Sequence, residues 1–133
     1  MRPATLREAV ARVLTGEPED VMLAEFVDTF YLTPGATERL ALLAEEPRLT
    51  GDQRLDAYIG GIAEYLAHHF ALEDAPAWAF KPERYLDRPW HTTPVQSPGI
   101  IEYLTWASPA EFKSRNIFTD EEPVRRARKP VRV

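Results

Sequence analysis

Between residues 52 and 72 the sequence carries its longest helical signal. Apolar side chains recur there every three or four residues, the spacing that places them on one face of an α-helix. This segment is therefore predicted to be the main core helix, and other elements must pack against its apolar face. The face is formed by Leu55, Tyr58, Ile59, Ile62, Leu66 and Phe70.

Two adjacent residues with low helix propensity, Gly60 and Gly61, lie inside this predicted helix. Each costs about 1 kcal/mol relative to alanine in a helix interior. We expect this cost to be offset by a neighbouring helix that approaches closely, and we prefer that interpretation to a kink.

Shorter helical signals precede the core helix. A helix over about 5–15 has the capping-box spacing of Thr5 and Glu8. A second helix is predicted to follow Pro18, and a third to begin with Thr33 as its cap and Pro34 as its first residue. The core helix itself is predicted to open with the Thr50–Gln53 capping box and to run to about Leu72.

The second half of the chain predicts short helices only. One is expected over 81–86, one after Ser97, one from Ser108 through Phe112, and a last one from Thr119 toward Arg128. Strand-like alternation is nowhere sustained. The sequence therefore predicts an all-α fold: one domain of about six to seven helices over residues 1–128, with a frayed basic tail at 129–133.

The segment from residue 73 to residue 98 has an unusual composition. It contains five of the twelve prolines together with Trp78, Phe80, Tyr85 and Trp90. Linkers lack large aromatic side chains, so we expect short turns whose aromatic rings pin an irregular segment to the core. Since Trp and Tyr are also enriched at interface hot spots, the segment favours a protein-binding role.

Composition narrows the function classes. The chain has no cysteine, which excludes disulfides, thiolate metal sites and a cysteine nucleophile. It shows no signal-peptide pattern and no apolar run of membrane-spanning length, so a cytoplasmic protein without a membrane partner is expected. Residues 113–133 carry seven basic and three acidic residues, net +4, whereas the preceding 112 carry nine basic and eighteen acidic, net −9. The basic tail leaves nucleic-acid binding as one alternative, although the acidic body argues against it.

One cluster invites a chemical interpretation. Glu64 and His68 are four residues apart on the core helix and share a face, as metal-binding pairs in helical bundles do. His68 and His69 point about 100° apart and cannot grip one ion together. A metal protein or an enzyme that uses Glu64, His68 and His91 is therefore kept as an alternative, while the favoured hypothesis has no catalytic residue and no cofactor.

Three pieces of sequence resemble a group of small, mostly uncharacterised bacterial helical proteins over about residues 52–127. They are Leu55–Ala67 followed by Ala75–Trp78, then Pro82–Trp90, and then Ser108–Phe112 with Arg115–Phe118, and they occur in the same order in that group. Some members look like regulators with an added helix-turn-helix, and some are encoded beside nucleotidyltransferase-like genes, as antitoxins are. The resemblance implies an antitoxin-like or regulatory partner of a nucleotidyltransferase-type protein.

Together these features favour a non-enzymatic, protein-binding helical domain, with homo-oligomerisation left open. The partner would be another protein, held by buried aromatic side chains and steered by basic residues. The predicted partner-binding residues are Trp78, Tyr85, Trp90, Phe118, Arg115 and Arg125.

Overall fold

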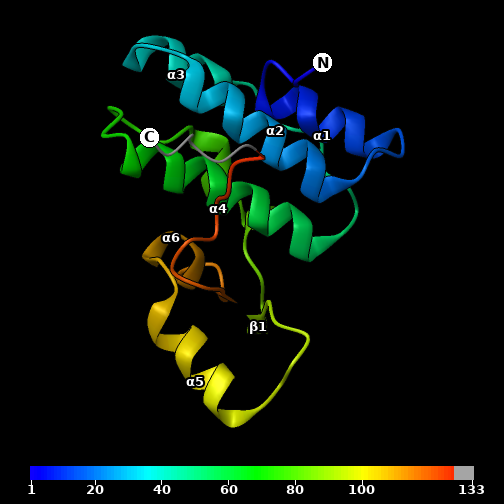
Figure 1. The fold of residues 1–133 in the computed structure, drawn as a ribbon, viewed down its shortest axis with the longest axis vertical. Coiled ribbons are helices and arrows are strands. Elements are labelled where there is room, and N and C mark those ends of the chain that lie inside the picture. Colours follow the sequence, from blue (N-terminus) through cyan, green and yellow to red (C-terminus); the bar gives the residue numbers. More distant parts are fainter. Residues whose placement is uncertain (128–133) are drawn as a thin grey trace, which may run out of the picture. The chain divides into compact units, whose positions relative to one another are not determined.

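The structure, a computed structural model, describes residues 1–127 (Figure 1). Within this part of the chain there are six α-helices, two 3-10 helices and one pair of two-residue strands, so the predicted all-α fold is confirmed. None of these helices combines the length and the apolar character that a membrane crossing requires. The elements in chain order are α1 (Leu6–Leu14), α2 (Glu19–Leu32), α3 (Ala36–Ala44), α4 (Gln53–His69), η1 (Ala77–Phe80), η2 (Pro82–Arg84), β1 (Trp90–His91), α5 (Pro98–Ala107), α6 (Ala110–Lys113) and β2 (Ile117–Phe118).

The chain divides into two compact units. The first contains Met1–Arg48 and the segment that begins at Val124, and the second contains Leu49–Pro123. The single domain expected over residues 1–128 stays a prediction, and the tail expected at 129–133 lies outside the described residues.

In the first unit, α1 packs against α2 and α3. The predicted cap of α1 is confirmed, because the Thr5 hydroxyl accepts a hydrogen bond from the Glu8 backbone N–H at 3.0 Å. The segment after Val124 joins this unit through Arg126, whose Nε donates to the buried carboxylate of Asp28 at 2.8 Å. The buried apolar side chains of the unit include Leu6, Ala9, Val10, Phe26, Val27, Phe30 and Leu43.

The predicted start of the third helix was wrong by two residues. Thr33 ends α2 instead: its backbone N–H donates to Phe30 O at 3.3 Å and its hydroxyl donates to Thr29 O at 2.7 Å. The N-cap of α3 is Gly35. Helix α3 begins at Ala36 after Gly35, whose φ of 90° suits glycine.

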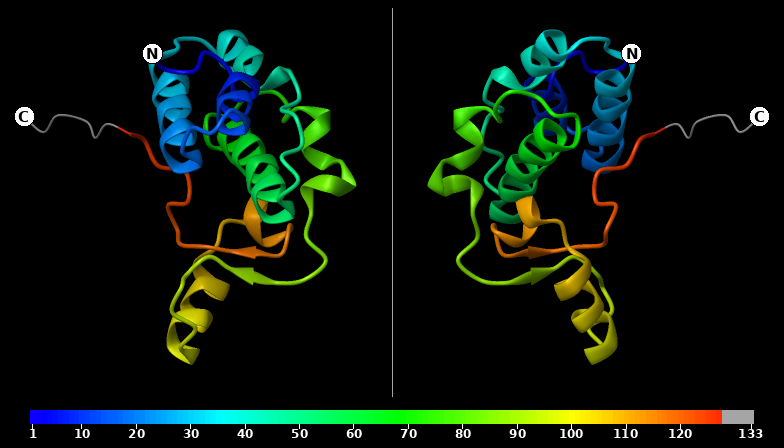
Figure 2. Two further views of the ribbon diagram at one scale, coloured as in Figure 1. Left: turned by 90° about the vertical axis from the view of Figure 1, so that its right-hand side faces the viewer. Right: turned by 90° about the vertical axis from the view of Figure 1, so that its left-hand side faces the viewer.

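In the second unit, α4 is the central element, and η1, η2 and α6 pack on it. Strand β1 pairs in parallel with β2, with Trp90 opposite Ile117 and His91 opposite Phe118. Helix α5 contacts β2 and lies on the opposite side of this strand pair from α4 (Figures 1 and 2). The strand pair was not expected from the sequence, since two residues are too few for an alternating pattern.

The glycine pair of α4 lies where neighbours approach most closely, as expected. A Cβ atom on Gly61 would lie 2.6 Å from the Phe112 ring of α6. A Cβ atom on Gly60 would lie 2.9 Å from Arg84 Cβ and 3.2 Å from Arg115 Nε. Helix α4 is continuous through both positions.

Both predicted ends of α4 were wrong. Helix α4 ends at His69, three residues early, because Ala71 adopts a left-handed φ of 52° and Leu72 N–H donates to Ala67 O at 2.8 Å. Its N-terminal cap is Asp52, whose carboxylate accepts from the N–H groups of Arg54 and Leu55, and not Thr50.

Two further errors concern Ser108 and Thr119, which were both expected to cap helices. The Ser108 hydroxyl instead accepts from Thr119 N–H at 2.7 Å, so the two residues bond to each other. No helix begins at Thr119 within the described residues. A helix capped there would take its first intrahelical bond from residue 123, which is proline and has no N–H.

Candidate functional site

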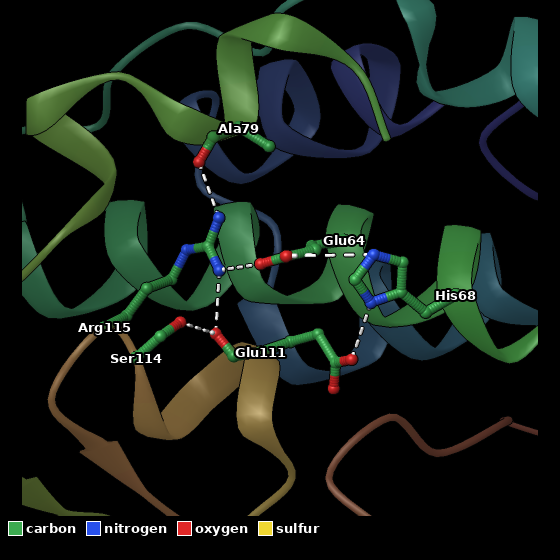
Figure 3. Close-up of polar contacts among 6 residues, drawn as sticks. All are labelled: Glu64, His68, Ala79, Glu111, Ser114 and Arg115. Atoms are coloured by element: carbon green, nitrogen blue, oxygen red, sulfur yellow. Dashed lines mark hydrogen bonds and ion pairs between the residues drawn. The ribbon is translucent and has the colours of Figure 1, made fainter. Parts of the chain in front are cut away.

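A buried polar cluster lies between α4 and α6 and is centred on Arg115 (Figure 3). Arg115 Nη1 donates to Glu64 Oε1 at 2.5 Å and to Glu111 O at 2.7 Å. Its Nη2 donates to Ala79 O at 2.6 Å. The side chain of Arg115 is 0% exposed. Its three bonds connect η1, α4 and α6.

Aromatic rings cover this guanidinium and that of a second buried arginine. Arg115 lies 4.7 Å from the Tyr85 ring centre. Arg84, also 0% exposed, lies 4.9 Å from the Trp78 ring centre and donates to Asp56 O at 3.3 Å. The Trp78 side chain is only 6% exposed. Of the predicted partner-binding residues, Trp78 and Arg115 are therefore covered by the chain's own elements in this conformation.

Sequence reasoning missed the role of Arg84. A Pro-Glu-Arg turn is ordinarily solvent-exposed, and the only signal of burial was a tryptophan six residues earlier, within reach of a cation–π contact. Gly60 lets η2 approach α4 closely at this place, because a Cβ atom there would lie 2.9 Å from Arg84 Cβ.

The alternative residues Glu64 and His68 are neighbours, as the helix spacing required (Figure 3). His68 Nδ1 lies 2.8 Å from Glu111 Oε2, and His68 Nε2 lies 3.9 Å from Glu64 Oε2. Glu64 is also paired with Arg115. Across residues 1–127, however, no three or more His, Asp or Glu side chains are arranged to hold a metal ion.

His91, the third residue of that alternative, has different contacts. Its ring stacks on Phe118 with 4.9 Å between the ring centres, and its Nε2 lies 3.4 Å from the Thr105 hydroxyl of α5. His91 and Phe118 are both half-buried. These contacts join the strand pair to α5.

Trp90 lies at the surface of the second unit beside α4. The Arg54 guanidinium lies 5.2 Å from the Trp90 ring centre, and the Tyr58 ring meets it edge-on at 6.1 Å. Trp90 is half-buried and lines an open hollow with Arg54 and His91. Arg125, the last predicted partner-binding residue, is exposed in the segment of the first unit that follows Val124.

Sequence reasoning did not single out the exposed aromatic face of α5. Trp106 is 78% exposed and Tyr103 is 50% exposed, whereas Leu104 on the opposite side is 5% exposed. Glu102 is the one charged residue of the helix. The signal was present in the sequence, because positions 103 and 106 share a helix face that the inward-facing residue 104 does not.

No family model matches the sequence, and no match is found among the curated proteins or the solved structures.

Proposed function

We propose that this chain is a non-enzymatic protein-binding module whose partner packs against the exposed face of α5. The observation that carries the proposal is the exposure of Trp106 and Tyr103 on one face of a helix with a single charged residue. Large aromatic side chains dominate interface hot spots, because they bury much apolar area and lose little side-chain entropy.

Contacts with the rest of the second unit hold α5 in an ordered conformation. Leu104 anchors α5 inward, and the N-terminus of the helix is capped by the Ser97 hydroxyl, which accepts from Ile100 N–H. At its other end, Ser108 bonds to the backbone N–H of Thr119. A pre-ordered helix binds with less loss of conformational entropy than a segment that must fold on binding.

The partner we propose is a nucleotidyltransferase-type protein with an apolar groove, in keeping with the antitoxin-like resemblance over residues 52–127. Recognition would follow the helix-in-groove mode, with Tyr103 and Trp106 as anchors one turn apart. Trp90, Tyr85 and Phe118 keep partly exposed side chains and are proposed as flanking contacts. Arg125 is exposed and is proposed to contribute to steering.

The test is affinity purification of the tagged full chain from the cell that produces it, with Trp106→Ser and Tyr103→Ser as variants. Leu49→Ser is the matched control, because Leu49 is 48% exposed in the same unit and lies outside α5. We expect one stoichiometric partner, of nucleotidyltransferase type, to be retained by the wild type and the control. We expect Trp106→Ser to weaken its binding by about 2 kcal/mol or more.

Circular dichroism must first show that every variant is folded. Equal recovery of the partner by wild type and Trp106→Ser would rule out the α5 face. The purification could instead recover the chain alone, and light scattering could show a dimer that Trp106→Ser dissociates. In that case the α5 face would bind a second copy of this chain and not the proposed partner.

A further inference from the structure

A hollow beside Trp90 is lined without acidic side chains, although the protein as a whole is acidic. Its volume is about 470 Å³. An adjoining hollow of about 260 Å³ shares Arg54, Pro89 and Trp90 with the first. The remaining lining residues of the larger hollow are His91, Thr92, Thr93, Pro94 and Gln96.

Two arginines at this place have no acidic partner. Arg54 contacts the Trp90 ring, and neither Arg54 nor Arg88 forms an ion pair with any of the described residues. Asp87 lines the smaller hollow but does not pair with either of them. The first 112 residues have a net charge of −9, yet Arg54 is the one Asp, Glu, Lys or Arg residue that lines the larger hollow; the smaller hollow holds Asp87 together with Arg54 and Arg88. A concave surface of one sign concentrates ligands of the opposite sign.

The exposed Arg54 side chain is oriented by one aromatic contact. Its guanidinium lies 5.2 Å from the Trp90 ring centre, and Tyr58 supports that ring edge-on. A contact with the ring face leaves the edge N–H groups of a guanidinium able to donate, and an oriented side chain loses less entropy on binding an oxyanion. A carboxylate or a phosphate accepts two such bonds at once.

Neutral donors surround the same space. The Thr92 hydroxyl and the Gln53 side-chain amide line the two hollows and make no hydrogen bond within the described part of the chain. The Thr92 backbone is fixed, because its N–H donates to Phe118 O at 3.0 Å. An oxyanion bound by Arg54 would therefore meet further donors from a second, separately anchored segment.

We propose that the hollow beside Trp90 binds a small molecule through its phosphate or carboxylate group. Arg54 provides the principal contact, Arg88 adds charge, and Thr92 donates a hydrogen bond. The small molecule is proposed to bind the chain without a partner at α5.

The experiment is a titration of the ¹⁵N-labelled full chain, followed by NMR, with inorganic phosphate, adenosine monophosphate and acetate in separate arms. Ionic strength is held constant with sodium chloride. The Trp90 indole N–H resonance, assigned with Trp90→Phe, reports the hollow. We expect saturation below about 10 mM for at least one probe, and the arm that saturates first distinguishes phosphate from carboxylate.

Arg54→Gln should weaken that binding by about tenfold, because it removes a charge-assisted contact. Lys113→Gln is the matched control: Lys113 is exposed in the same unit and lines neither hollow, so binding should be unchanged. Linear, unsaturated shifts with all three probes would overturn the proposal. Equal weakening by Arg54→Gln and Lys113→Gln would also overturn it, because it would reduce the effect to general charge.

Discussion

The guanidinium of Arg115 donates to the carboxylate of Glu64 across 2.5 Å, although Arg115 is completely buried and the Glu64 side chain is only 14% exposed. Desolvation of two charges is costly, and an ion pair in such a place is stable only when the remaining donors are also satisfied. Arg115 meets this condition in part, through the carbonyl oxygens of Glu111 and Ala79. The pair is thus a junction between three elements of the second unit.

The first prediction concerns this pair. Glu64→Leu should destabilise the second unit by about 3 kcal/mol, because it leaves a buried guanidinium without its counter-charge. Arg115→Met should cost at least as much, since two carbonyl oxygens also lose their donor. All three tryptophans, Trp78, Trp90 and Trp106, lie in this unit, so urea unfolding followed by tryptophan fluorescence measures it directly.

The double variant Glu64→Leu with Arg115→Met completes a thermodynamic cycle. It should be less destabilised than the sum of the single variants, because no buried charge is left unpaired. Additive effects, or a loss below about 1 kcal/mol for Glu64→Leu, would contradict a coupled buried pair.

The second prediction concerns the glycine pair of α4. Gly61→Ala should destabilise the second unit by about 1–3 kcal/mol despite the better helix propensity of alanine, because the new Cβ would lie 2.6 Å from Phe112. Gly99→Ala on α5 is the control, since nothing lies within 4 Å of a Cβ there. It should be neutral or stabilising by about 0.5 kcal/mol. Unfolding in urea ranks the two variants, and equal effects would mean that close packing is not what selects Gly61.

Local signals in the sequence predicted most helices but not all of their ends. Thr5 caps α1 and Ser97 caps α5 as expected, because a cap needs only residues within one turn. Ser108 and Thr119 had the same local pattern, yet they bond to each other across 11 positions. A tertiary hydrogen bond of this kind leaves no trace in residue spacing.

The candidate sites were harder to predict than the fold. Adjacent glycines correctly indicated a close approach, but not that buried arginine side chains fill the space beside Gly60. Arg115 was expected to contact a partner, as surface arginines do, and it is instead fully buried. The exposure of Trp106 was missed although the helix spacing indicated it, since a tryptophan in an apolar helix is ordinarily assigned to the core.

The third prediction concerns the segment that follows Val124 in the first unit. Arg126→Met should destabilise that unit by about 2 kcal/mol, because Asp28 is 0% exposed and would lose a charged donor. The Tyr31 ring, 4.8 Å from the Arg126 guanidinium, would lose a cation–π contact as well. Hydrogen exchange of the α2 amides measures this change in a unit that contains no tryptophan.

Arg125→Met is the control for that measurement. Arg125 is exposed, and exposed charges contribute little to stability, so exchange in α2 should change by less than about 0.5 kcal/mol. If both substitutions had the same effect, the Arg126–Asp28 pair would have no special role.

The last prediction is a pH dependence at the start of α1. The pKa of Glu8 is lowered from its ordinary value, chiefly because its carboxylate accepts a hydrogen bond from the Ala4 N–H at 2.7 Å and also because Arg12 donates to it. In the folded protein Glu8 therefore holds fewer protons than in the unfolded chain over the interval between the two pKa values, and stability rises with pH across it. The contribution is complete above the ordinary pKa and is lost as the pH falls through the lowered one.

Glu8→Gln should thus destabilise the first unit more at pH 6 than at pH 3, measured by thermal unfolding in far-UV circular dichroism. Because the Glu8 side chain is 38% exposed, the difference should shrink in high salt, and a difference independent of pH would show that Glu8 acts without its charge.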